Sequence, residues 1–186
     1  MKLSRIAFSA ALLAQVAQPA LAAADEPSET LFYDVQVKVS NADKTILFAE
    51  VWVPRNQAVT FDSMKVRPVK MTCPPNQNMP NPPPVHEGIR LGLTMGAEIN
   101  KEAFVEGAVY VSEVVPSGIK EFGVCKQEGV MDQMMAAQVS SRIKEGLSLK
   151  VPLYPLVVNA YVLEAKFLQA SETLPEGKTA GAFYPL

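Results

Sequence analysis

The feature that most constrains this chain is an alternation of apolar and polar residues with a period of two. In the segment 30–40, TLFYDVQVKVS, apolar side chains occupy every second position, which indicates a strand with one buried side and one solvent-facing side. The segment 44–54, KTILFAEVWVP, is apolar on both sides and ends at Pro54, which has no N–H for a ladder. Asn41–Asp43 supplies turn residues between them. The two segments are therefore predicted to form a β-hairpin.

Further strand-like segments follow, separated by prolines and glycines. They lie at 58–73, 88–99, 103–116, 118–126 and 147–168. The tripeptide Pro116-Ser117-Gly118 predicts a turn, and the tail 176–186 is predicted to be a loop. Seven or eight short strands separated by prolines and glycines predict an all-β fold, either a mainly antiparallel β-sandwich or a barrel-like domain.

One segment, 130–146, departs from this pattern. Its apolar residues recur at steps of four, and it is rich in methionine, alanine and glutamine, which favour helices. Gly146 stands where a helix cap would lie. The sequence thus predicts at most one α-helix, near 130–145. The alternative is a hairpin with Lys144–Gly146 as its turn and Gly146 in the left-handed conformation.

The N-terminal residues have the form of a secretory signal peptide. Lys2 and Arg5 precede a short apolar run, and small residues follow at Ala20–Ala24. We predict cleavage after Ala22, within a residue or two, so that 1–22 is removed. Residues 23–29 are then a disordered lead-in, and 30–186 form a single β-rich domain of ordinary size.

Charge and targeting together restrict the partners of this domain. Without residues 1–22 the chain has 15 basic and 19 acidic side chains, a formal charge of −4. A mildly acidic domain lacks the basic face that nucleic acid requires, and no later segment is apolar enough for a membrane span. The form of the signal peptide and the absence of an N-x-S/T sequon favour a bacterial periplasm, with an extracellular location as the alternative.

Cys73 and Cys125 are the only cysteines, and both lie in the exported part. An even number of cysteines in an oxidising compartment predicts a disulfide bond between them. That bond closes a loop of about 50 residues, which corresponds to about 4 kcal/mol in the chain-entropy model.

Most enzyme classes lack the residues they need in this chain. A histidine-dependent triad would have to use His86, the only histidine, which lies in a proline-rich segment with no G-x-S-x-G nearby. There is no H-E-x-x-H, no phosphate-binding glycine loop and no C-x-x-C pair. The sequence therefore predicts no catalytic residues and a non-enzymatic protein.

Two chemical alternatives remain open. Glu50 lies between Phe48 and Trp52 on one strand face, where desolvation would raise its pKa as a general acid requires, so a small carboxylate-dependent hydrolase is one alternative. The other is a periplasmic copper-binding protein, since thioether and imidazole are soft ligands. Its candidate ligands are Met71, Met79 and His86. Otherwise no cofactor is predicted.

The segment 73–88, CPPNQNMPNPPPVHEG, holds six prolines. Prolines favour an extended polyproline conformation, so a segment of this kind loses little entropy when it docks. The candidate partner-binding residues are Pro80, Pro82, Pro83 and Pro84. We predict a structural or partner-binding component of the cell envelope that binds another envelope protein through this loop, with a stiff spacer as the alternative role for the loop.

Overall fold

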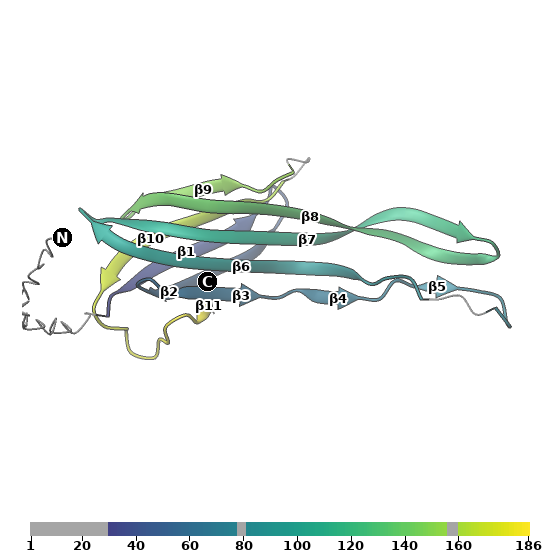
Figure 1. The fold of residues 1–186 in the computed structure, drawn as a ribbon, viewed down its shortest axis with the longest axis horizontal. Helices are drawn as coiled ribbons and strands as arrows, with labels where there is room; N and C mark the ends of the chain where they lie inside the picture. Colours follow the sequence, from purple (N-terminus) through teal and green to yellow (C-terminus); the bar gives the residue numbers. More distant parts are fainter. Residues whose placement is uncertain (1–29, 78–80, 156–159) are drawn as a thin grey trace, which may run out of the picture.

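The computed structural model describes residues 30–77, 81–155 and 160–186. The predicted signal peptide, the whole of the predicted lead-in, and Met79 and Pro80 lie outside the described residues. The described part is all-β, and its strands form two antiparallel sheets packed face to face as a β-sandwich (Figure 1). The strands are β1 (Phe32–Ser40), β2 (Thr45–Pro54), β3 (Ala58–Asp62), β4 (Lys65–Arg67), β5 (Met71–Thr72), β6 (Val85–Ile99), β7 (Glu102–Phe122), β8 (Cys125–Lys144), β9 (Ser148–Pro152), β10 (Val162–Ser171) and β11 (Phe183–Pro185).

The first sheet, sheet A, has the strand order β11-β2-β1-β10-β9. The predicted hairpin of β1 and β2 is confirmed, with Phe32 opposite Pro54 and Asn41 in the turn, where its side chain accepts two backbone N–H bonds. The tail is not entirely loop, because Phe183–Pro185 forms β11 on the edge of β2. Sheet B has the order β3-β6-β7-β8-β5, and β4 also pairs with β6.

The core lies between the two sheets and follows from the alternation in the strands. Every second residue of each strand faces the opposite sheet, and these positions hold Val, Leu, Ile and aromatic side chains. Tyr33 and Phe167 meet edge to face, with ring centroids 5.8 Å apart. The largest core side chains are Tyr33, Tyr161, Phe167, Ile89, Leu91, Met95, Met135, Leu153 and Leu163. Burying each contributes about 1.5–3 kcal/mol.

The predicted helix near 130–145 is wrong, since residues 125–144 form the continuous strand β8. A step of four residues is also two strand periods, so Met131, Met135 and Val139 share one face of a strand as they would share one face of a helix. Gly146 does have the left-handed conformation of the alternative prediction, with φ of 80°. The strands on either side of it belong to different sheets, however, so this turn carries the chain from sheet B to sheet A.

The predicted turn at Pro116-Ser117-Gly118 is also wrong. These residues interrupt β7 only as a bulge, because Pro116 pairs with Val130 and Gly118 with Gly129. The chain reverses instead at Gly123, which has φ of 62°. β7 and β8 therefore form one long hairpin of 21- and 20-residue strands.

This hairpin is longer than the sheet that covers it. At about 3.3 Å per residue, β7 and β8 extend roughly 65 Å, whereas the strands of sheet A extend about 35 Å or less. Sheet B thus continues well beyond the end of sheet A (Figure 1). We call this projecting part the arm, and it consists of Glu113–Phe122 of β7, Cys125–Met134 of β8, Val85–Glu87 of β6, β4 and β5.

Candidate functional site

The arm is held together by one disulfide and two short strands. Cys73 and Cys125 form the predicted disulfide bond, which lies at the far end of the arm. Just before Cys73, β5 pairs with β8, and a surface ion pair joins Arg67 of β4 to Glu128 of β8 at 2.8 Å. The disulfide also indicates an oxidising, exported environment.

The arm is strongly twisted near its middle. The extra residue Ser117 in β7 produces a bulge, and β7 and β8 cross each other in the view of Figure 1 where the hairpin projects from the body. Bulges increase the local twist of a strand pair. Gly118 has φ of 85°, and a Cβ on Gly129 would overlap the carbonyl oxygen of Gly118. Two glycines are therefore needed where the strands cross.

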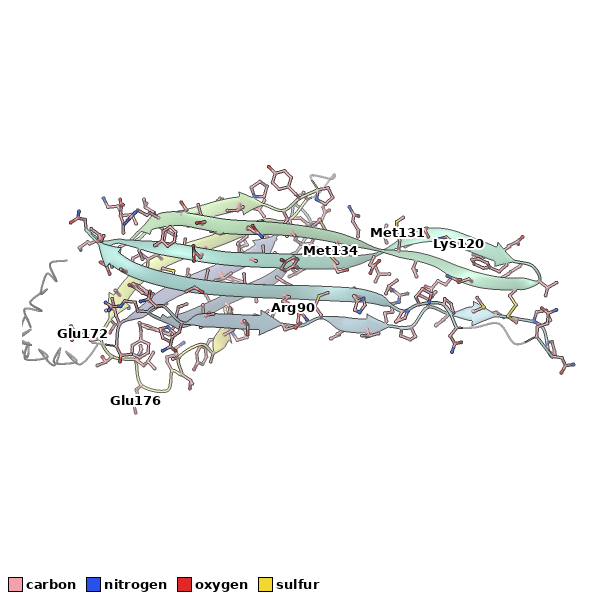
Figure 2. All side chains as sticks on the ribbon, in the orientation of Figure 1. Arg90, Lys120, Met131, Met134, Glu172 and Glu176 are labelled. Carbon is pink, nitrogen blue, oxygen red and sulfur yellow. A yellow bond between two sulfur atoms is a disulfide. The ribbon has the colours of Figure 1, made fainter. Side chains whose placement is uncertain are left out.

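Exposed apolar side chains are concentrated on the arm. Twelve large apolar side chains of the described residues are exposed, and six of them belong to the arm, although it is a small part of the molecule. These six, counting Val124 in the turn between β7 and β8 as part of the arm, are Val66, Ile119, Phe122, Val124, Met131 and Met134. Figure 2 shows Met131, Met134 and Lys120 along the projecting hairpin, and Glu172 and Glu176 at the opposite end of the molecule. Exposed apolar side chains that are concentrated in one part of a molecule are typical of interaction surfaces.

Part of this exposure has a simple structural cause. Cross-strand partners share a sheet face, so the pair Val115 and Met131 continues the row of Val111 and Met135, which is buried in the core. Beyond the end of sheet A nothing among the described strands covers that row, and Met131 is 52% exposed. The arm is thus a stretch of sandwich sheet without its partner sheet.

A cavity of about 330 Å³ lies at the base of the arm, where the two sheets separate. Ile46, Ile89 and Val111 form its apolar walls, and Tyr161 is fully buried beside it. The polar lining residues are Lys44, Ser63, Lys65, Glu87, Ser112 and Glu113.

Three of the lining residues form one polar cluster. The Tyr161 hydroxyl donates a 2.5 Å hydrogen bond to Glu113, and Lys44 forms a 2.5 Å ion pair with the same carboxylate oxygen. Burial raises the pKa of Glu113, but the bonds from Lys44 and Tyr161 outweigh this effect and hold the pKa below its ordinary value. Burial and the bond to Glu113 raise the pKa of Tyr161 to about 12. The cluster therefore keeps its charges at neutral pH and ties both sheets together at the cavity.

Sequence reasoning missed this cluster, although one signal was present. Glu113 continues the inward-facing row of β7 that includes the buried Val105, Val109 and Val111, and such a carboxylate needs a buried partner. Lys44 and Tyr161 come from a turn and from the residue before β10, and only the packing of the sheets brings them together.

The proline-rich loop connects β5, at the far end of the arm, to β6, which begins at Val85 opposite Arg67 of β4. Among the candidate partner-binding residues, Pro83 and Pro84 are exposed and Pro82 is half-buried, while Pro80 lies outside the described residues. The loop therefore adjoins the arm, and its docking role stays a prediction.

The candidate copper ligands are not gathered into one group in the described part of the chain. Met71 is on β5 next to β8, whereas His86 is on β6 opposite Val66 and 3.9 Å from Asp132. Met79 lies outside the described residues, and Cys73 is in the disulfide. Within the described ranges no three His, Cys, Asp or Glu side chains are grouped to hold a metal.

Glu50 is paired with a cation, whereas the hydrolase hypothesis requires a carboxylate without such a partner. Its carboxylate accepts a 2.8 Å hydrogen bond from the Trp52 indole and forms a 3.0 Å ion pair with Lys178. Burial raises the pKa of Glu50, but these two partners outweigh it, so the pKa is lowered and not raised as we expected. A carboxylate that stays ionised is a poor general acid at neutral pH.

The pKa of Asp34, which lies on the same sheet face as Glu50, is shifted in the opposite direction. Its side chain is buried, one carboxylate oxygen has no hydrogen-bond partner, and burial together with the Glu50 charge raises its pKa. For a carboxyl group with a raised pKa, ionisation destabilises the fold above the folded-state pKa, and the penalty disappears as the pH falls below the ordinary pKa.

Asp34→Asn is therefore expected to stabilise the protein at pH 7, by on the order of 1 kcal/mol, because it removes a poorly partnered buried charge. The gain over the original protein should shrink as the pH is lowered towards 4. Urea unfolding at both pH values measures it. Asp62→Asn is the matched control, since the pKa of Asp62 is lowered by the Met64 backbone N–H and Arg90, and it should give no gain. Equal stability of Asp34→Asn and the original protein at pH 7 would contradict this account.

No family model, curated protein or solved structure was found to match this chain. Within the described residues, no helix has the length and apolarity needed to cross a membrane.

Proposed function

We propose that this protein is an exported, non-enzymatic structural or partner-binding component of the cell envelope, and that it binds another envelope protein through the arm. The observation that carries the proposal is the concentration of exposed apolar side chains on the arm, where sheet B continues without a covering sheet. Association would remove this surface from water, which is the main driving force of protein–protein binding.

The rigidity of the arm also supports a binding role. The disulfide, the β5–β8 pairing and the bulge fix its strands before any partner arrives. A preorganised surface loses less conformational entropy on association than a flexible one. Pro83 and Pro84 are exposed and directly precede β6 of the arm, so we include the proline-rich loop in the proposed surface.

The periplasm is the location that we propose. The disulfide favours an oxidising compartment, and the first 22 residues have the form of a signal peptide. Together they favour a bacterial envelope protein.

Site-specific photo-crosslinking in intact cells of the source organism tests the proposal. A photoreactive amino acid replaces Lys120 on the arm, Pro83 in the proline-rich loop, or Glu172 and Glu176 at the opposite end (Figure 2). All four positions are exposed. We expect a discrete crosslinked species from Lys120 that is at least about five times more abundant than from Glu172 or Glu176, because the exposed apolar side chains of the described residues are concentrated on the arm.

A crosslink at Pro83 as well as Lys120 would place the loop in the interface, whereas a crosslink at Lys120 alone would leave the loop as a spacer. The absence of any crosslink from Lys120, or equal products from both ends of the molecule, would refute binding through the arm.

A further inference from the structure

The outer edge of β8 has a gap between two pairing partners. At the far end, the Glu128 N–H donates to the carbonyl of Lys70, 2.9 Å away. Nearer the body, Ala136 and Tyr154 exchange two backbone bonds of 2.7 Å. Between these points, in residues 129–135, β8 pairs with β7 on its other side, and no described residue pairs with the outer edge.

The alternation of the strand identifies which backbone groups face this gap. Glu128 and Ala136 both direct their N–H groups away from β7, and β8 pairs with β7 without a slip from Val130 to Ala136. In an antiparallel ladder the hydrogen-bonding direction alternates from one residue to the next. Val130, Asp132 and Met134 therefore direct their N–H and C=O groups outward, like the two residues that are already bonded.

The side chains around the gap are suited to a strand. Met131 and Met134 project from opposite faces of β8 and are 52% and 57% exposed, and both lie where the hairpin leaves the body (Figure 2). A strand added along this edge would place its own side chains beside these methionines. Methionine adapts its shape to varied apolar neighbours.

The charge at the centre of the gap discriminates between occupants. If a second copy of this chain paired antiparallel through the same three residues, Asp132 would stand opposite Asp132, and like charges directly opposite each other are destabilising. A basic residue opposite Asp132 would instead be stabilising. We propose that the edge Val130–Met134 binds an extended segment of another protein by strand addition, and that this segment alternates apolar residues and carries a basic residue opposite Asp132.

This inference specifies the partner chemistry of the proposed arm interface and rests on that proposed function. Strand addition obtains affinity from main-chain hydrogen bonds and specificity from alternate side chains. Three residues of β8 in the gap direct their backbone groups outward, and every second residue does so. The gap therefore has room for about six residues of an added strand.

The test uses the full oxidised protein and an end-capped octapeptide that alternates threonine and valine and has one lysine at its centre. Amide hydrogen exchange is followed by NMR. With excess peptide, the amides of Val130, Asp132 and Met134 should exchange at least about tenfold more slowly, because each gains a hydrogen-bond partner. A second peptide with glutamate in place of the lysine should bind at least about fivefold more weakly.

Two variants distinguish the contribution of the Asp132 backbone N–H from that of its side-chain charge. Asp132→Pro removes one outward N–H while leaving the bonds to β7 intact, and edge positions tolerate proline, so this variant should lose peptide binding. Asp132→Asn keeps the N–H and removes the charge, so it should still bind but should no longer distinguish the two peptides.

The proposal is overturned if the three amides are already protected without peptide, if the lysine peptide leaves their exchange unchanged, or if Asp132→Pro binds as well as the original protein. None of these results depends on crosslinking from Lys120 in cells, so strand addition can fail while binding through the arm stands. Conversely, if the lysine peptide binds but Lys120 gives no crosslink in cells, strand addition stands and binding of an envelope partner through the arm is refuted.

Discussion

Replacing Cys73 and Cys125 together by alanine is expected to lower the free energy of unfolding by about 4 kcal/mol, and to loosen the arm before the body of the sandwich. The disulfide joins residues 52 positions apart. Without it the unfolded chain gains the conformational entropy of a long open loop, which favours unfolding. It also releases β5, a strand of only two residues, from the edge of β8. Alanine is chosen because Cys125 is buried, and a serine hydroxyl there would add a desolvation cost.

Urea unfolding measures the global loss, and amide exchange measures the local one. The amides of residues 119–128 should lose protection first, whereas those of β1 and β10 should keep it. Reduction of the original protein under native conditions is the matched control, and it should give the same pattern. A double variant within about 1 kcal/mol of the original protein, with an equally protected arm, would show that β-pairing alone holds the arm.

Gly129→Ala is expected to destabilise the protein by about 3 kcal/mol, although alanine normally favours a strand over glycine. The new Cβ would overlap the Gly118 carbonyl where the hairpin strands cross. The atoms nearest to this Cβ are all backbone atoms of Gly118 and Ser117. No flexible side chain can move away from it, so the bulge has to open. Forced overpacking of this kind costs about 1–3 kcal/mol and occasionally more.

Gly92→Ala is the matched control because a Cβ there meets no atom within 4 Å. It lies in β6 of the same sheet, so it tests the general effect of a glycine-to-alanine change in a strand. Urea unfolding of both variants gives the comparison. If Gly129→Ala were within about 0.5 kcal/mol of Gly92→Ala, the crossing of the strands would not depend on glycine.

The sequence predicted the fold class from backbone-level patterns. The period of two in β1 and β2 and the turn at Asn41 needed no tertiary information, because strand faces and turn residues are local properties. The cysteine pair was predicted from its even number and the exported setting, and the disulfide is present.

The errors arose where one local pattern is compatible with two structures. A step of four residues fits both a helix face and a strand face, so Met131 and Met135 could not distinguish them. Pro116-Ser117-Gly118 is compatible with both a turn and a bulge, and the pairing of β7 with β8 selected the bulge. Glu50 between aromatic residues indicated a raised pKa, but Lys178, 128 residues later, reverses the direction.

The sequence by itself determined that this chain forms an all-β domain with one disulfide, since alternation, turn residues and paired cysteines are encoded residue by residue. Only the tertiary structure decided that β7 and β8 extend past sheet A, that Lys44, Glu113 and Tyr161 meet at a cavity, and that no described residue pairs with the outer edge of β8 at Asp132. These features depend on which strands become neighbours and where each sheet ends. Such long-range pairings are set by packing across the whole core and leave little trace in any short segment.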